Sequence, residues 1–368
     1  MRVVSLNQDA GIGPERKKGA AVHLLAMREA FREAGHAVHS LDSADDICAR
    51  TELENALRGT DLLYERYALG RSLGSELCAT RGVPHVVELN APLADEDRAY
   101  RGGTGDPGLD AREAAIFSRA TLVIAVSQQV AAYAIARGAL RDNVLVRPNG
   151  VDARRFVPRK AGDSLRNQLV PPGRFVLGFH GRLRPWHGLS LLGEAAATLL
   201  SGNYPIHLVL VGEGNFKEAL GERVAPEHIT RVPWVPHIEM PRFVATFDAL
   251  PLTYAPDGPS YFSPLKLAEA MACGVVPVFP LLGDLPQLLK DGTDSLGYTP
   301  GDAEGLTRTL AYLMDNPSVT QRLSHAAVAR AGLQSWRAIA DDVIDWVEGR
   351  LGPADTLLAS PSPGRRPR

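Results

Sequence analysis

Two consecutive series of short apolar segments, each interrupted by stretches with helical spacing, constrain the fold of this chain more than any other feature. The apolar segments of the first series are residues 3–6, 37–41, 61–64, 85–89, 121–126 and 143–147. Stretches with helical spacing lie between them, near residues 51–58, 70–80, 110–118 and 128–138. Regular alternation of strands and helices favours an α/β fold built on a doubly wound parallel sheet.

The second series begins after a break rich in turn residues. Pro148-Asn149-Gly150 interrupts the alternation, and the polar stretch 158–173 lacks any periodicity. Apolar segments then resume at residues 175–179, 206–211, 229–235, 249–253 and 275–279. The sequence therefore predicts two Rossmann-like domains, residues 1–158 and 159–335, facing each other across a ligand-binding cleft. A helix over 336–352 is a candidate to pack back on the first domain, and the tail 353–368 has the composition of a disordered segment.

Length and composition exclude several classes of protein. The chain has 368 residues, more than one hydrophobic core usually spans, and its formal net charge of −2 gives no reason to expect a nucleic-acid partner. The three cysteines fit neither a disulfide framework nor a clustered metal site, so we expect a cytoplasmic protein. No apolar run approaches the ~20 residues of a membrane span, which leaves peripheral membrane contact open.

The stretch from Pro259 to Gly274 carries the most distinctive chemistry. Ser263 is a suitable N-cap and Pro264 suits the first helical position, so a helix is expected to run from there to Gly274. Lys266 falls in the first turn, where the helix dipole disfavours a cation and favours a bound anion such as phosphate. Glu269 follows on the same helical face. A solvated ion pair between Lys266 and Glu269 is the alternative interpretation.

Two further loops follow predicted strands of the second series. Arg182 and His187 lie between a strand and a helix, where both can reach one anion, although Arg182 could instead pair with a structural carboxylate. Gly212 and Gly214 follow the next strand, where small residues let a ligand approach the backbone and a plain tight turn needs the same glycines.

These motifs, in this order, resemble glycosyltransferase family 4, a group of retaining, nucleotide-sugar-dependent transferases with the GT-B fold. The resemblance rests on Asn149 to Asp152, Gly181 to Gly188, Val211 to Gly214 and Ser263 to Gly274. It extends into the first series through residues 19–23 and 35–38, and so covers nearly the whole chain to about residue 350.

The resemblance implies a metal-independent hexosyltransferase that uses a nucleotide-sugar as a co-substrate, needs no cofactor, and transfers the sugar to a hydroxyl acceptor. Glu269 matches the glutamate that binds the ribose hydroxyls, the backbone of 262–265 would lie against the donor diphosphate, and Arg182 would neutralise it. The implied catalytic residues are Asn90, Arg182 and Lys266. The implied acceptor-binding residue is His23, and the implied donor-binding residues are Gly19, Gly181, His187, Gly212, Tyr261, Phe262, Ser263, Pro264, Leu265 and Glu269.

The chain departs from the family pattern at three positions. His187 replaces a lysine, Tyr261 replaces a glutamate, and Asn90 occupies the place of a histidine. An asparagine can donate a hydrogen bond but cannot act as a general base. Two alternatives therefore stay open: a catalytically weakened nucleotide-sugar-binding partner, or a nucleotide-sugar epimerase on the same fold. The sequence specifies neither the nucleotide base, the sugar, the acceptor (glycan, lipid-linked or small natural product) nor the oligomeric state.

Overall fold

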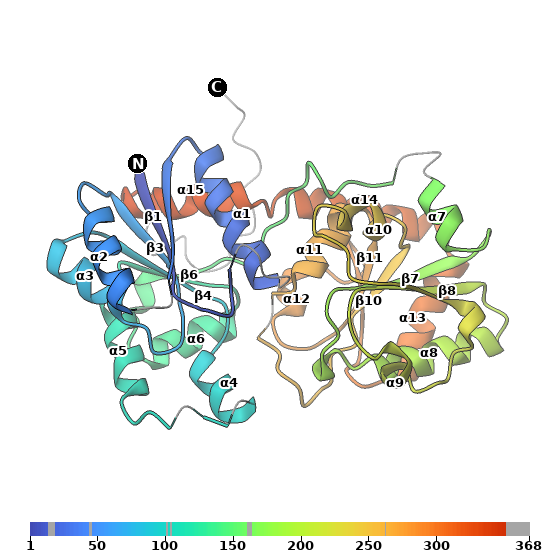
Figure 1. Ribbon diagram of the computed structural model, residues 1–368. Helices are drawn as coiled ribbons and strands as arrows, with labels where there is room; N and C mark the ends of the chain where they lie inside the picture. Colours follow the sequence, from blue (N-terminus) through green and yellow to red (C-terminus); the bar gives the residue numbers. More distant parts are fainter. Residues whose placement is uncertain are drawn as a thin grey trace. The chain divides into compact units, whose positions relative to one another are not determined.

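The computed structural model describes residues 1–13, 19–43, 46–100, 102–103, 105–159, 164–261 and 263–350. Two units make up this part of the chain, one formed by Met1–Asn149 with the segment from Trp336, the other by Gly150–Ser335. Each unit holds a six-stranded parallel sheet flanked by helices (Figure 1). The α/β fold with two doubly wound sheets is thus confirmed.

The sheet of the first unit has the strand order β2-β1-β3-β4-β5-β6. Its strands are β1 (Arg2–Asn7), β2 (Ala37–Asp42), β3 (Leu62–Arg66), β4 (His85–Leu89), β5 (Leu122–Ala125) and β6 (Val144–Val146). The helices between them are α1 (Gly19–Glu33), α2 (Asp46–Ala56), α3 (Leu73–Arg81), α4 (Leu93–Tyr100), α5 (Leu109–Arg119), α6 (Gln128–Ala136) and the 3-10 turn η1 (Arg141–Asn143). Strands β3, β4, β5 and β6 are buried along their whole length, as expected for parallel strands covered on both faces.

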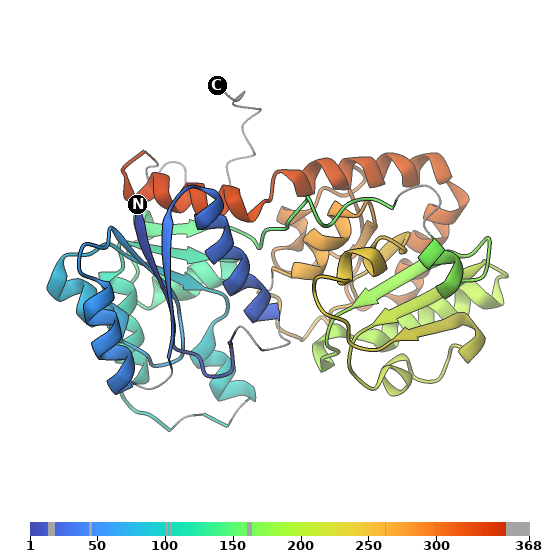
Figure 2. The same ribbon diagram turned by 45° about the horizontal axis from the view of Figure 1, so that its top comes forward.

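The last described helix, α15 (Trp336–Val347), belongs to the first unit, where it packs beside α1 (Figures 1 and 2). The Trp336 ring lies 4.7 Å from the His23 ring, and the Arg337 guanidinium donates a 2.6 Å hydrogen bond to the Glu33 carbonyl. An ion pair of 2.5 Å between Arg147 and Asp342 fixes the other side of the helix. The expected tail, 353–368, lies outside the described residues.

The division between the units lies at Asn149–Gly150, earlier in the chain than the expected boundary at 158. The Val151 amide donates a 2.8 Å hydrogen bond to the Gln334 carbonyl, and Phe156 is buried in a hydrophobic core of the second unit. Packing of Phe156, which turn chemistry in the sequence does not reveal, therefore places this segment with the second unit.

The sheet of the second unit has the strand order β12-β11-β10-β7-β8-β9. Its strands are β7 (Phe175–His180), β8 (Ile206–Val211), β9 (Ile229–Val232), β10 (Ala249–Pro251), β11 (Val276–Pro280) and β12 (Leu296–Tyr298). Its helices are α7 (Ser164–Leu169), α8 (Leu189–Ser201), α9 (Phe216–Leu220), α10 (Met240–Val244), α11 (Leu265–Ala272), α12 (Leu285–Leu288), α13 (Ala303–Asp315) and α14 (Pro317–Gly332), with 3-10 turns η2 (Pro185–His187) and η3 (Pro226–His228). The chain builds β7, β8 and β9 outward in one direction and then returns to place β10 on the other side of β7.

Alternate residues of the central strands belong to two hydrophobic cores, one on each face of this sheet. Val209 and Val211 pack with α11 in one core, whereas Leu208 and Leu210 pack with α8 in the other. Both faces are therefore sealed, and polar side chains gather at the strand ends.

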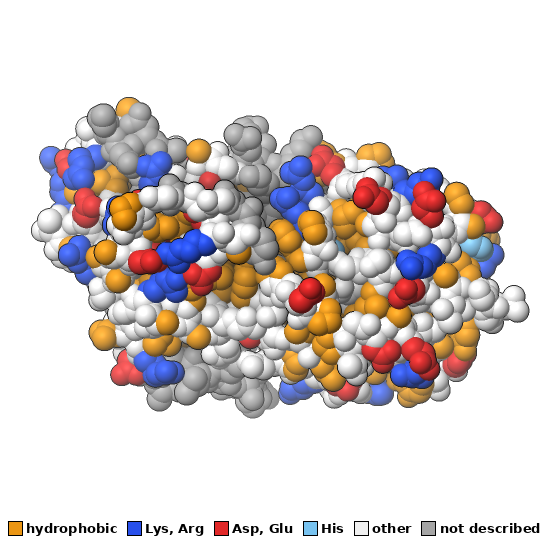
Figure 3. Space-filling view, turned by 90° about the horizontal axis from the view of Figure 1, so that it is seen from below, with side chains coloured by type: hydrophobic (Ala, Val, Ile, Leu, Met, Phe, Trp, Pro, Cys, Tyr) orange, Lys and Arg blue, Asp and Glu red, His pale blue; other side chains and the backbone are white. Residues whose placement is uncertain are grey.

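Within the described residues, no helix has the length and apolarity needed to cross a bilayer. Basic and acidic side chains are interspersed over the face of the second unit seen in Figure 3.

Candidate functional site

The candidate site lies in the second unit, where the strand order reverses between β7 and β10. Ligands of open parallel sheets bind outside the carboxyl ends of the strands at such a reversal. The loop from β7 to α8 and the loop from β10 to α11 both leave this point of the sheet. They carry Arg182 and His187 on one side and the Ser263–Glu269 stretch on the other.

Helix α11 begins at this edge without a side-chain cap. Pro264, in an extended conformation with φ −71° and ψ 119°, is the N-cap, so the helix starts one residue later than expected from Ser263. Pro264 itself makes no side-chain capping hydrogen bond to the first-turn amides. The far end matches the prediction, because Gly274 adopts the left-handed φ of +75°. Uncapped amides at the start of a helix can bind an anion when other cationic groups assist.

Lys266 lies in the first turn of α11 and is half-buried. Its Nζ is 3.1 Å from Nε2 of His187 and 4.2 Å from the centre of the Phe179 ring. Burial lowers the pKa of Lys266 to about 7, although the Glu269 carboxylate acts in the opposite direction. The amine is therefore close to its deprotonation point at neutral pH.

His187 does not supply a second positive charge. Its Nδ1 accepts a 3.0 Å hydrogen bond from the Arg184 backbone N–H, and burial, with help from Lys266 and Arg184, lowers its pKa to about 2. A neutral imidazole whose Nδ1 is an acceptor carries its proton on Nε2. The Nε2–H then donates to Nζ of Lys266, which accepts only as an uncharged amine.

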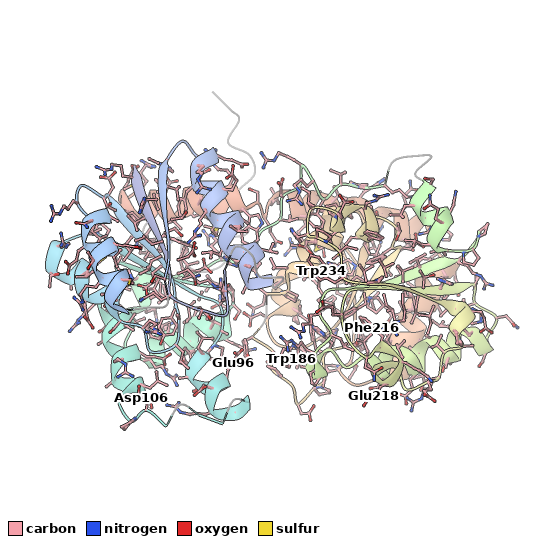
Figure 4. The ribbon with its side chains drawn as sticks, in the orientation of Figure 1. Glu96, Asp106, Trp186, Phe216, Glu218 and Trp234 are labelled. Carbon is pink, nitrogen blue, oxygen red and sulfur yellow. The ribbon has the colours of Figure 1, made fainter. Side chains whose placement is uncertain are left out.

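Around these two residues the loop after β7 leaves room for a ligand. Arg182 is exposed, and no described residue forms a hydrogen bond or ion pair with its guanidinium, so the structural-carboxylate alternative is not realised within the described chain. A Cβ at Gly181, whose φ is +105°, would meet nothing within 4 Å, whereas one at Gly212 would lie 2.2 Å from the Gly181 carbonyl oxygen. The two loops thus pack backbone to backbone at Gly212 and stay open at Gly181. Trp186, labelled in Figure 4, is half-buried beside His187.

Glu269 is buried on α11 and is held by two histidines. Its Oε2 lies 2.8 Å from Nε2 of His180, and its Oε1 lies 2.7 Å from Nε2 of His237. Burial by itself would raise the pKa of Glu269, but the hydrogen bonds from the two histidines hold it at about 2. Among the described residues Lys266 pairs with His187 and not with Glu269, so the interpretation as a solvated Lys266–Glu269 ion pair is wrong.

Sequence reasoning missed three residues of this site. His180 ends β7 directly before the Gly181-Arg182 motif, and a histidine that closes a buried apolar strand is a signal that could have singled it out. His237 and Phe179 offer no comparable signal, because only the fold brings a loop residue after β9 and an apolar strand residue to α11.

The first unit holds a separate polar cluster around Glu88, at the end of β4. Glu88 lies 2.6 Å from the Tyr64 hydroxyl, 2.5 Å from the Arg66 guanidinium and 3.1 Å from Nε2 of His23, and it accepts a further hydrogen bond from the Asn90 side chain. Burial would raise the pKa of Glu88, yet His23 and Arg66 hold it well below its usual range. The structure thus brings together Asn90 and His23, two of the expected site residues.

The remaining expected residues fall in two places. Gly19 is the exposed first residue of α1 in the first unit. Tyr261, Ser263, Pro264 and Leu265 are half-buried beside the start of α11. Phe262 lies outside the described residues. Within the described chain, no group of three or more histidine, cysteine and acidic side chains has the arrangement of a metal site.

Part of the second unit matches a known protein family. Residues 174–316, which include β7, α11 and both candidate loops, match the family described as glycosyl transferases group 1. The match covers most of the second unit and no part of the first. The chain is similar to D-inositol 3-phosphate glycosyltransferase 1 of Catenulispora acidiphila, with 26% identity over 307 residues that cover 77% of this chain and 71% of the relative.

Solved glycosyltransferase structures share the fold. Anabaena HepE in complex with UDP and glucose superposes with a TM-score of 0.74 and 20% identity, covering 95% of this chain and 100% of HepE. The sucrose-phosphate synthase of Thermosynechococcus elongatus gives a TM-score of 0.74 and 18% identity, covering 95% of this chain and 99% of the synthase. The fold of this glycosyltransferase is therefore of the GT-B type, as the resemblance implied.

Proposed function

We propose that this protein is a retaining glycosyltransferase that moves a sugar from a nucleotide-sugar donor to a hydroxyl acceptor without a metal ion. The match of residues 174–316 to the glycosyl transferases group 1 model and the similarity to a D-inositol 3-phosphate glycosyltransferase support glycosyl transfer as the reaction. The residues at the start of α11 support the finer assignment of the donor site.

Lys266, Arg182 and the uncapped amides of α11 would hold the donor diphosphate. Cleavage of the sugar–phosphate bond loads negative charge on the leaving group, and fixed cations and dipoles stabilise that charge. Lys266 suits this task because burial disfavours its protonated form, and a bound anion would favour that form. His187 would act by orienting the amine instead of adding charge.

Glu269 would bind the ribose of the nucleotide. An ionised carboxylate only accepts hydrogen bonds, so it selects hydroxyl groups and repels phosphate. Glu269 lies three residues after Lys266 on the same helix. The ribose of the nucleoside diphosphate would therefore contact Glu269, and its diphosphate would contact Lys266.

Asn90 and His23 would serve the acceptor and the transferred sugar from the first unit. The Asn90 amide can donate to a sugar hydroxyl but cannot take a proton from the acceptor. We propose that the departing phosphate helps to deprotonate the acceptor hydroxyl on the face from which it leaves, which retains the anomeric configuration.

The presence of Lys266 in the first turn of α11 and of Glu269 three residues later, at the strand-order reversal, is the observation that carries this proposal. Calorimetric titration with UDP, GDP, ADP and dTDP tests it, with UDP first because HepE was solved with UDP. We expect one nucleotide to bind, and binding by none contradicts the donor site.

Turnover separates this function from its alternatives. Release of free nucleotide only when an acceptor is present supports a transferase and excludes an epimerase, whereas binding without turnover on any acceptor supports a nucleotide-sugar-binding partner. The anomeric configuration of the product, read by proton NMR, tests retention. Activity that survives EDTA supports the metal-independent mechanism, and activity lost to EDTA contradicts it.

A further inference from the structure

We propose that His180 and His237 are positioning residues that aim the Glu269 carboxylate at the vicinal hydroxyls of the donor ribose and so set a preference for ribonucleotides over 2′-deoxyribonucleotides. This inference rests on the proposed donor site. It concerns two histidines that neither the sequence motifs nor the comparisons assign.

Each histidine takes one oxygen of the carboxylate. The contacts, 2.8 Å from His180 to Oε2 and 2.7 Å from His237 to Oε1, fix both the position of Glu269 and the rotation of its carboxylate plane. A carboxylate offers about four lone-pair directions, so about two remain after these bonds. Two neighbouring hydroxyl groups supply two donors at the matching spacing, which a single hydroxyl does not.

The His180 imidazole donates as a neutral group. Nδ1 of His180 is buried and no described atom bonds it, and burial lowers the pKa of His180 although Glu269 acts to raise it. The bond to Glu269 therefore uses the Nε2–H of an uncharged ring. Because a neutral donor such as His180 does not cancel the charge of Glu269, the carboxylate keeps its strength as an acceptor for further hydroxyl groups.

The two histidines differ in their surroundings, because His180 is buried in the sheet and His237 is partly exposed to solvent. His180 is 3% exposed at the end of β7, and its position is fixed by the sheet. The His237 side chain is one-third exposed in the loop after β9, where its ring lies 5.5 Å from that of Phe156. Replacement of His237 therefore removes one bond to Glu269 without opening the core of the sheet.

The test compares the binding of UDP and 2′-deoxy-UDP to the full-length protein by calorimetry, or the matching pair if another base is preferred. We expect the wild type to bind the ribonucleotide at least about tenfold more tightly, the scale of a hydrogen bond to a charged group. In His237→Leu this ratio should fall toward one, mainly through weaker binding of the ribonucleotide. His237→Gln, which keeps an N–H donor, should restore most of the ratio, and His180→Gln should behave in the same way if it folds.

His228→Leu is the matched control, because His228 lies in the same unit but outside the site. An unchanged ratio in His237→Leu, equal loss of affinity for both nucleotides, or no preference in the wild type would each overturn the inference. Failure of the wild type to bind any nucleoside diphosphate would instead overturn the proposed function. A melting curve of each variant confirms that the comparison is made between folded proteins.

Discussion

At the scale of single residues, Lys266 shows how the proposed donor site would receive an anion. Its Nζ accepts from the Nε2–H of His187 and lies over the Phe179 ring, and neither group carries a negative charge. A donor diphosphate would supply that negative charge. In the proposed function, binding of the donor would therefore favour the protonated form of Lys266.

This coupling predicts a pH dependence of donor binding. Because Lys266 must take up a proton to pair with the diphosphate, affinity should fall as pH rises above about 7, by at most about tenfold per pH unit. Calorimetry in buffers of different ionisation enthalpy would measure the proton uptake directly. Lys266→Met should bind more weakly and lose this pH dependence, and a flat wild-type profile would contradict the mechanism.

The lowered pKa of Glu269 predicts a different effect, which concerns the stability of the folded protein at acid pH. Its folded-state pKa of about 2 lies below the ordinary value of 4.5, so the unfolded chain binds more protons between these values. The stabilisation from ionised Glu269 is therefore present above about pH 4.5 and is lost as the pH falls toward 2. Urea unfolding of wild type and Glu269→Gln should give a free-energy difference that shrinks over this range.

Glu218→Gln is the control for this experiment, because Glu218 is exposed on α9 (Figure 4). Its difference from the wild type should stay small at every pH. A difference for Glu269→Gln that does not vary with pH would show that the two histidines do not hold an ionised carboxylate.

At the scale of secondary-structure elements, α15 completes the first unit although it is the last helix of the described residues. Trp336 is buried against His23 of α1, which links the C-terminal helix to the residue expected to contact the acceptor. The position of α1 therefore depends on a helix more than 300 residues away in sequence, as the hydrogen bond between Arg337 and Glu33 also shows.

Trp336→Ala should destabilise the first unit by about 3–5 kcal/mol, the usual cost of removing a buried tryptophan. Urea unfolding followed by circular dichroism measures the change. Trp346→Ala is a matched control, because it changes the same residue type at a half-buried position of the same helix, where a smaller loss is expected. Equal losses for both variants would show that the contact with His23 contributes nothing specific.

At the scale of the whole molecule, the nucleotide-binding groups belong to one unit and the Glu88 cluster to the other. Hydrogen exchange should therefore locate donor binding: UDP, or whichever nucleotide binds, should protect residues 180–188 and 263–272 most strongly. Protection concentrated around Glu88 instead would place the nucleotide in the first unit and contradict the assignment.

The sequence by itself determined the fold class, the number of sheets and the residues at the start of α11. Apolar alternation reports burial on both faces of a parallel sheet, and Lys266, Glu269 and Gly274 lie within one short helix, so local spacing was enough to group them. Tertiary structure decided the partners of these residues. His180, His187 and His237 reach α11 from three different loops or strand ends, and the tautomer of His187 depends on a backbone amide that no residue pattern reveals. Contacts between segments distant in sequence are fixed by the packing of the sheet. The sequence therefore located the charged residues, and only the fold showed which neighbours set their protonation states.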